Sequence, residues 1–232
     1  MSDSTVSGSG RTGHDRVPDA AAPACATPRQ RDAERTRKAI LAAAMLEFAQ
    51  YGLGGARVER IADRAGLAKR LIFYYFGTKE NLFRATLHES YKSIRDAEQA
   101  LRLDALAPAD AIRRLIEFTW NYYLGHPEFL TLLNSENLHQ ARHIADSSDL
   151  PDVNVPLIRT LGEVVERGRR DGVFRGGVDP LQLYISIAGL AYFYLSNNAT
   201  LSVIFGRDLK TAKALNERVS HINDVVLGYL LR

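Results

Sequence analysis

The chain has few of the residues that stabilise secreted or membrane proteins. Its 232 residues include a single cysteine, Cys25, so no disulfide framework can form and a reducing compartment is expected. No run approaches the roughly 20 apolar residues that a membrane span requires. The N-terminus also lacks the basic and then apolar pattern of a secretion signal. Together these absences predict a cytoplasmic protein that does not interact with membranes.

Patterns of common catalytic sites are missing as well. There is no strand pattern, no glycine-rich loop that would hold a phosphate after a strand, and no serine, histidine and aspartate set with a nucleophile turn. No catalytic residue, cofactor or metal is therefore predicted. Hydrophobic residues make up 46% of the chain and charged residues 25%, which is typical of a globular protein with one large or two small domains.

Positive charge is distributed unevenly along the chain. Residues 31–79 contain 10 Lys and Arg against 5 Asp and Glu, whereas residues 80–232 contain 17 against 19. Residues 1–30 contain 3 of each, so the net charge of +3 comes from one basic segment on a slightly acidic remainder. Such a segment is typical of phosphate binding, although a solvated surface would show the same excess.

Two short amphipathic segments meet at a glycine between residues 58 and 79. The first places four apolar residues on one helix face at the spacing i, i+3, i+4 and i+7: Val58, Ile61, Ala62 and Ala65. Gly66 then supplies the positive φ that a sharp helix end often needs. The second segment starts at Ala68, and Ile72 and Phe76 form its inward pair. The pattern predicts two helices joined by a tight turn.

The outer face of the second helix combines cations and aromatic rings. Lys69, Arg70, Phe73 and Tyr74 share this face. The four consecutive aromatic residues that end at Phe76 cannot all point inward, because neighbours on a helix lie roughly 100° apart. A cationic and aromatic face suits a DNA major groove. An ordinary helical hairpin with aromatic core residues is the alternative interpretation.

The run AGLAKRLIFYYFGTKENLF, residues 65–83, resembles the helix-turn-helix signature of TetR-type transcriptional regulators. Two departures concern helix starts, because Arg57 and Ala68 stand where the family usually carries a capping Ser or Thr, worth roughly 1 kcal/mol. A third is Phe73, at the position of the family's usual phosphate-contacting tyrosine. The resemblance implies a homodimer that binds a palindromic DNA operator and is released by a small-molecule effector, most simply as a repressor.

The resemblance also implies roles for individual residues. Lys69, Arg70 and Tyr74 would read or grip the DNA groove next to Phe73. Arg57, Tyr75 and Lys79 would hold phosphates. Arg35 and Thr36 near the start of the first helix are further candidates for phosphate contacts, with solvated surface residues as the equal alternative.

The predicted fold class is all-α, with a three-helix N-terminal domain followed by a helical effector-binding and dimerisation domain. We expect a flexible tail over residues 1–31, a helix-turn-helix domain over 32–79 and the second domain over 80–232. The tail is either inert or an arm that places Arg29 and Arg31 near DNA. Periodicity predicts a first helix over 32–51, a loop over 146–156, and further helices over 79–103, 109–124, 127–144, 155–171, 180–198 and 208–231.

The last two predicted helices carry the dimerisation prediction. The segment 180–197 is apolar on nearly all sides, so it needs cover from more than one direction. In the resembled family the last two helices of each subunit form a four-helix dimer interface. A twofold dimer would place two recognition helices in successive major grooves, about 34–36 Å apart.

The second domain is also expected to hold the effector, because aromatic residues there could line a cavity with a few polar groups. The candidate ligand-binding residues are Trp120, Tyr123, Asn137, His139, His143 and Tyr192. Two rival classes remain open. Glu136, His139 and His143 share a predicted helix face and could hold a metal in a helical enzyme. Alternatively, the chain could be a dimeric scaffold that does not bind DNA.

Overall fold

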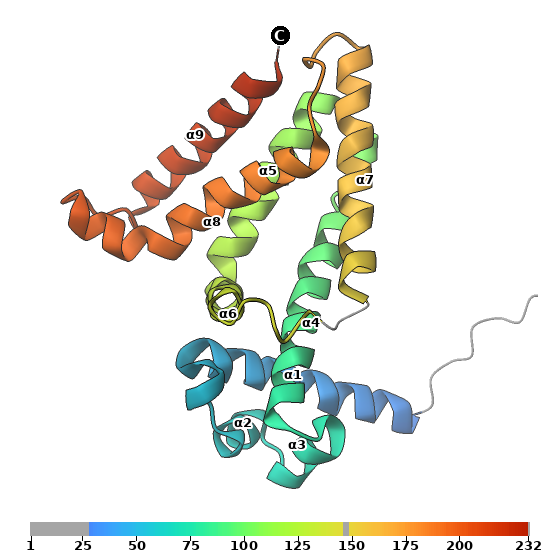
Figure 1. Cartoon of the computed structure of the whole chain (residues 1–232), viewed down its shortest axis with the longest axis vertical. Coiled ribbons are helices and arrows are strands. Elements are labelled where there is room, and N and C mark those ends of the chain that lie inside the picture. The colour runs from blue at the N-terminus through green and yellow to red at the C-terminus, as the bar shows by residue number, and fades with distance from the viewer. Residues whose placement is uncertain (1–27, 146–148, 232) are drawn as a thin grey trace, which may run out of the picture.

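The computed structural model describes residues 28–145 and 149–231. Within these ranges the chain forms nine α-helices and one short 3-10 turn, with no strand beyond an isolated bridge between Phe174 and Leu231 (Figure 1). The predicted all-α fold is therefore confirmed. None of the helices in the described ranges is long and apolar enough to cross a membrane.

Three helices form one end of the elongated molecule, and we call them the head: α1 (Pro28–Gly55), α2 (Val58–Ala65) and α3 (Lys69–Phe76). The expected first helix over 32–51 was too short at both ends. Residues 28–31, expected in the tail, form the first turn of α1, whereas the rest of the tail and Cys25 lie outside the described residues. At the other end α1 continues past Gly52, whose φ of 64° interrupts the helical geometry.

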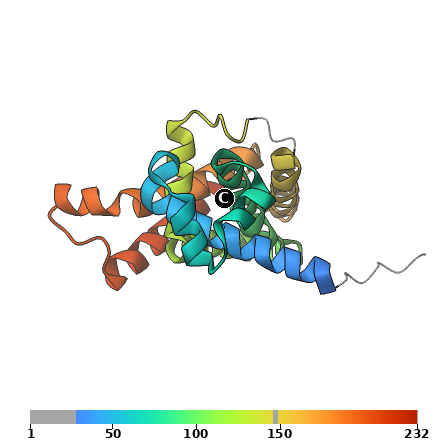
Figure 2. The same cartoon turned by 90° about the horizontal axis from the view of Figure 1, so that it is seen from below.

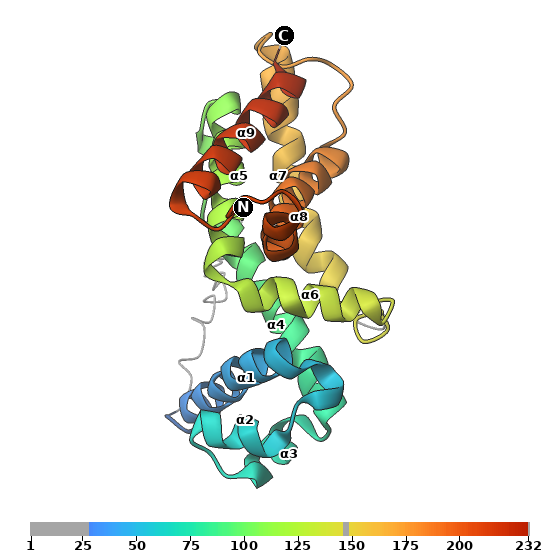
Figure 3. The ribbon, with the colours of Figure 1, turned by 90° about the vertical axis from the view of Figure 1, so that its left-hand side faces the viewer.

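Helix α4 (Lys79–Gln99) leads from the head into the remaining helices, which we call the body (Figure 3). The body comprises the 3-10 turn η1 (Leu103–Ala105), α5 (Pro108–Gly125), α6 (Pro127–Leu138), α7 (Asp149–Arg170), α8 (Pro180–Ile204) and α9 (Ala212–Leu230). Asp179 caps α8 by accepting from the backbone N–H of Leu181 at 2.8 Å, with Pro180 at the first helical position, as predicted.

Several helix boundaries differ from the prediction: α4 ends four residues before 103, α9 starts four residues after 208, and three further differences concern α6, α7 and α8. Helix α6 ends at Leu138 rather than continuing to 144, because Gln140 and Ala141 have φ values of 56° and 59°. Most of the expected loop over 146–156 is helical, since α7 starts at Asp149 and includes Pro156. Helix α8 extends six residues beyond 198. Tertiary packing thus outweighs the local signals that predicted breaks.

Two separate cores stabilise the head and the body. In the head, α1 to α4 bury Ile40, Phe48, Ile61 and Phe83, and the Phe48 and Phe83 rings meet edge to face at 5.0 Å. The body core is built from α4, α5, α7, α8 and α9 around such residues as Leu115, Leu161, Ile187 and Ile222. Because α4 supplies side chains to both cores, a movement of this helix would change the packing of both.

Helix α6 provides a second connection between the two cores. It lies across the top of the head in Figure 3, and its Leu132 is fully buried in the head core. Beyond its end, the backbone carbonyl of His143 accepts a hydrogen bond from Arg84 Nε of α4 at 2.9 Å. The His143 ring also meets the Phe83 ring edge to face at 5.1 Å. The position of the head is therefore fixed by α6 as well as by α4.

Candidate nucleic-acid interface

The corner between α2 and α3 has the geometry expected of a helix-turn-helix. Gly66 adopts φ 67° and ψ 32°, the left-handed conformation predicted for this position. The N–H of Leu67 donates to the carbonyl of Ala62 at 3.0 Å, which closes the end of α2. No side chain caps α2 at Arg57 or α3 at Ala68. Another contact must hold the start of α2.

A buried carboxylate of α1 supplies that contact. Glu47 is fully buried, and its Oε1 accepts from the backbone N–H of Arg57 at 3.0 Å and from Arg60 Nε at 2.6 Å. Arg64 Nη2 lies 4.0 Å from the other oxygen. Burial alone would raise the pKa of Glu47, but the hydrogen bonds from Arg60 and the Arg57 backbone lower it below the usual value. The ionised carboxylate fixes α2 against α1.

Glu47 was not among the site residues predicted from the sequence. The available signal was an acidic residue next to Phe48 and Ala44 on the apolar face of the first helix. A charge in such a place is rarely buried without a partner.

Helix α3 presents one buried and one exposed face. Ile72 and Phe76 are buried, as predicted for the inward pair, whereas Tyr74 is 79% exposed and Phe73 43% exposed. Lys69 and Arg70 are exposed and Tyr75 is half-buried. The Tyr74 and Tyr75 rings contact each other edge to face at 5.2 Å. The exposed face of α3 therefore combines two cations with two accessible aromatic rings.

The cations of the head differ in how they are held. Lys69 forms an ion pair with Glu59 of α2 and lies 5.7 Å from the centre of the Phe73 ring. Arg70 has no ion-pair partner among the described residues. Lys79 Nζ donates to the carbonyl of Ala56 at 3.3 Å, which places it beside Arg57 at the start of α2. Two cations thus meet the positive end of a helix dipole, an arrangement that attracts phosphate.

The two residues at the start of α1 that were predicted to contact phosphate both bond to Asp32 of the same helix. Arg35 pairs with Asp32 at 3.0 Å, and Thr36 Oγ1 donates to the carbonyl of Asp32 at 2.9 Å. Both pairs are exposed, so water or a phosphate can compete for Arg35.

The six candidate ligand-binding residues do not form one cluster. Trp120 and Tyr123 are buried in the body core, where Trp120 packs against Tyr194 with ring centres 5.8 Å apart. Burial raises the pKa of the Tyr123 phenol. Tyr192 donates to the amide oxygen of Asn134 on α6, whereas Asn137 is exposed. None of the six lines any of four cavities found in the described part of the chain.

Glu136 and His143 close a loop instead of sharing a helix face with His139. Glu136 Oε1 accepts from the backbone N–H of His143 at 2.8 Å and of Ile144 at 3.2 Å, and its Oε2 lies 2.7 Å from His143 Nδ1. His139 Nδ1 lies 2.7 Å from the carbonyl of Ser135. The single-face argument for a metal fails because α6 ends at Leu138. Within the described ranges no three His, Cys, Asp or Glu residues are grouped to hold a metal ion.

An all-helical chain whose head has this corner and this exposed α3 face is a helix-turn-helix protein. The sequence pattern of bacterial regulatory proteins of the tetR family matches residues 40–86, and that of the tetracyclin repressor-like C-terminal domain matches residues 108–226. The chain belongs to the TetR family of transcriptional regulators and is a DNA-binding protein.

Among its relatives is the HTH-type transcriptional repressor NicS of Pseudomonas putida, 41% identical over 88% of this chain and 96% of NicS. The HTH-type transcriptional regulator RutR of Escherichia coli is 27% identical over 86% of this chain and 92% of RutR. The fatty acid degradation regulator FadR from Bacillus halodurans shares the fold with a TM-score of 0.63 and 20% identity, covering 83% of this chain and 94% of FadR.

Proposed function

We propose that the protein is a homodimeric repressor that binds a palindromic operator and leaves it when a small-molecule effector binds the body. The observation that carries the proposal is the exposed face of α3, where Lys69, Arg70, Phe73 and Tyr74 lie opposite the buried Ile72 and Phe76. The naming of NicS as a repressor supports the direction of regulation. We propose no catalytic activity, and we place the protein in the cytoplasm, where its DNA partner is accessible.

The DNA contacts divide into base reading and phosphate binding. Lys69, Arg70 and Tyr74 would enter the major groove, with the Phe73 ring beside them in place of a tyrosine. Arg57, Tyr75 and Lys79 would contact phosphates around the start of α2. Because Lys69 is paired with Glu59, binding must exchange this partner for DNA, whereas Arg70 starts without one. We therefore propose Arg70 as the stronger contact of the two.

Dimerisation through α8 and α9 accounts for apolar side chains that the single chain leaves exposed. Ile185 and Phe193 of α8 are 52% and 58% exposed, and Tyr229 of α9 is 45% exposed. A groove of about 270 Å³ runs between the two helices past Leu190 and Val225. Large exposed apolar patches usually mark interaction surfaces. A second copy of these helices would cover them and complete a four-helix interface.

The α8–α9 connection projects away from the rest of the body, as Figure 2 shows. Its tip exposes Val203 by 83% and Ile204 and Phe205 by 70% each. The tip is held in place, because Tyr194 OH donates to the carbonyl of Leu209 at 2.9 Å. A second subunit packed against α8 would lie within reach of this apolar tip.

Effector binding in the body would act on DNA binding through α4, which contributes to both cores. The division into a tail, a DNA-binding domain over 32–79 and an effector domain over 80–232 is part of this proposal. Our candidates for effector contacts remain the buried Trp120, Tyr123 and His143, the half-buried His139 and Tyr192, and the exposed Asn137. A coupling of a few kcal/mol between two packings is sufficient.

Selection of DNA from a random pool tests the proposal. The full-length protein is incubated with random duplexes, bound DNA is recovered, and the enriched sequences are compared. We expect a motif with twofold symmetry, and a sedimentation experiment should show a dimer. A monomer that enriches no sequence would refute the proposal, and a dimer that enriches none would support the scaffold alternative instead.

A further inference from the structure

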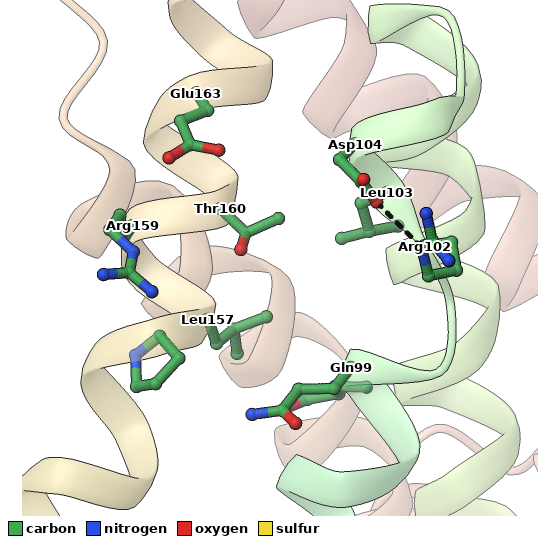
Figure 4. A pocket seen from close by; sticks show the side chains of 10 residues that line it. Gln99, Arg102, Leu103, Asp104, Leu157, Arg159, Thr160 and Glu163 are labelled. Carbon is green, nitrogen blue, oxygen red and sulfur yellow. Dashed lines mark hydrogen bonds and ion pairs between the residues drawn. The ribbon is translucent and has the colours of Figure 1, made fainter. Parts of the chain in front are cut away.

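A cavity of about 450 Å³ opens between the end of α4, the η1 turn and α7. Figure 4 shows Leu157 and Thr160 of α7 pointing across it toward Gln99 and Leu103. Its volume suits a small molecule, and its position is separate from the buried Trp120 and Tyr123. No function considered so far uses this cavity.

The walls of the cavity are held in place. Arg167 of α7 donates to the carbonyl of Asp104 at 2.6 Å and to that of Leu106 at 2.7 Å, so η1 is tied to α7 beyond the cavity. Arg102 at the other wall adopts φ 50°, which is unfavourable for a residue with a side chain, and its Nε pairs with Asp104 at 3.4 Å. These contacts keep the walls from closing the space.

Glu98 gives the cavity its chemical character. The residue lines the cavity and is only 2% exposed. Arg95 Nη1 donates to Oε2, but Oε1 has no hydrogen-bond partner among the described residues. Burial raises the pKa of Glu98 to about 7 although Arg95 acts in the opposite direction. A carboxylate oxygen without a donor is costly inside a protein, so a turn of the Glu98 side chain that brings this oxygen to an N–H group of a ligand in the cavity is favourable.

Charge decides which ligand fits. Arg102 is already paired with Asp104, and Glu163 adds a second carboxylate near Arg159. An anionic ligand would lie beside the buried Glu98 and be repelled. A purely apolar ligand would leave its free oxygen without a donor.

We propose that this cavity binds a small cation, an amine or amidine whose N–H groups donate to the free oxygen of Glu98. The Thr160 hydroxyl and the Gln99 amide on opposite walls can hold its polar edge. Arg159 and Glu163 on α7 are exposed at the edge of the cavity and leave an entrance.

A ligand bound to Glu98 would act on α4, which contacts both the body and the head. Arg95 bridges Glu98 and the Tyr184 hydroxyl of α8, so a ligand that draws Glu98 away changes the link between α4 and α8. The same helix begins at Lys79 in the head. This regulatory consequence rests on the proposed effector-responsive function, whereas the binding site itself does not.

Titration calorimetry of the full chain without DNA tests the site with three probes of one shape: benzamidine, benzamide and benzoate. At mildly alkaline pH we expect benzamidine to bind one site per chain, at least about tenfold more tightly than benzamide, and benzoate not to bind. Glu98→Gln should weaken benzamidine binding by about tenfold or more. Glu166→Gln, an exposed change on α7, should leave it unaltered.

Thr160→Phe is a second variant that keeps Glu98 and fills the cavity from α7, and it should prevent benzamidine binding without disturbing Arg95. The proposal is overturned if benzamidine fails to bind at millimolar concentration, if benzoate binds equally well, or if both variants bind as the original chain does. If benzamidine binds but operator affinity stays the same, the regulatory link is overturned and the site is supported. A chain that binds no DNA would leave the calorimetric comparison intact.

Discussion

The head and the body each bury a glutamate, and the two carboxylates behave in opposite ways. Glu47 and Glu98 are 0% and 2% exposed. Glu47 receives hydrogen bonds from the Arg60 side chain and the Arg57 backbone and has a second cation, Arg64, nearby, so its pKa is lowered. Glu98 receives one donor, and burial raises its pKa to about 7. Equal burial therefore has opposite consequences, depending on how many donors reach the carboxylate.

This difference between the two carboxylates matches the different tasks of the head and the body. The head must present α3 at a fixed angle to DNA, and the two hydrogen bonds to Glu47 Oε1 fix α2 against α1. The body must respond to a ligand, and an unsatisfied carboxylate beside a cavity leaves hydrogen-bonding capacity for one. Each carboxylate has one oxygen without a hydrogen bond from the described residues, so the two differ in the number of donors and in the Arg64 cation 4.0 Å from Glu47.

The largest expected effect concerns the carboxylate of the head. Glu47→Gln removes the charge that faces Arg60 and Arg64 and should lower the free energy of unfolding by about 1.5–3 kcal/mol, because these partly exposed cations and the N–H of Arg57 lose a charged acceptor. Urea unfolding measures the loss. Glu98→Gln should cost less, since a neutral side chain at that position resembles the protonated form already present near neutral pH. Equal losses of unfolding free energy in Glu47→Gln and Glu98→Gln would contradict the difference between the two carboxylates.

The pH dependence of stability sharpens the comparison. The pKa of Glu98 rises from 4.5 to about 7 on folding, so the folded state holds a proton that the unfolded state has lost. Its contribution to stability is full below pH 4.5 and falls as pH rises to about 7, by roughly 3 kcal/mol in total.

Urea unfolding at both ends of this window, with the original chain and Glu98→Gln, isolates this contribution from other titrating groups. The variant should lose less stability as pH rises. For Glu47, whose pKa is lowered, stability is instead present above its ordinary pKa and lost as pH falls. An identical pH profile in the original chain and Glu98→Gln would contradict the assignment.

The smallest expected effects concern single DNA contacts on the head. Arg70→Ala should weaken operator binding by about 1–3 kcal/mol and reduce its salt dependence. Lys69→Ala should cost less, because Lys69 must first leave Glu59. Glu59→Gln should accordingly strengthen binding slightly. Lys92→Ala in α4, which removes an exposed pair with Asp96, serves as the control. The order of effects would be refuted if Lys69→Ala cost more than Arg70→Ala.

Periodicity was sufficient to predict the helical fold and the two faces of α3, because these depend on residues within one or two turns. The Glu47 cluster was missed since its donors lie 10 and 13 residues away in another helix. The end of α6 was missed because a loop closed by the Glu136 carboxylate replaces the expected helix. The cavity could not be predicted, since its walls come from segments more than 50 residues apart along the chain.

The contact between α6 and the head has a practical consequence for protein engineers who exchange sensors among regulators. A fusion that joins a foreign head at residue 79 would keep Leu132 but lose the hydrophobic pocket that receives it. The transplanted piece would also have to replace the ring of Phe48, which meets the retained Phe83 edge to face. In a working hybrid of this scaffold, the foreign head must therefore carry the surface that contacts α6 as well as its own DNA-reading helix in the place of α3.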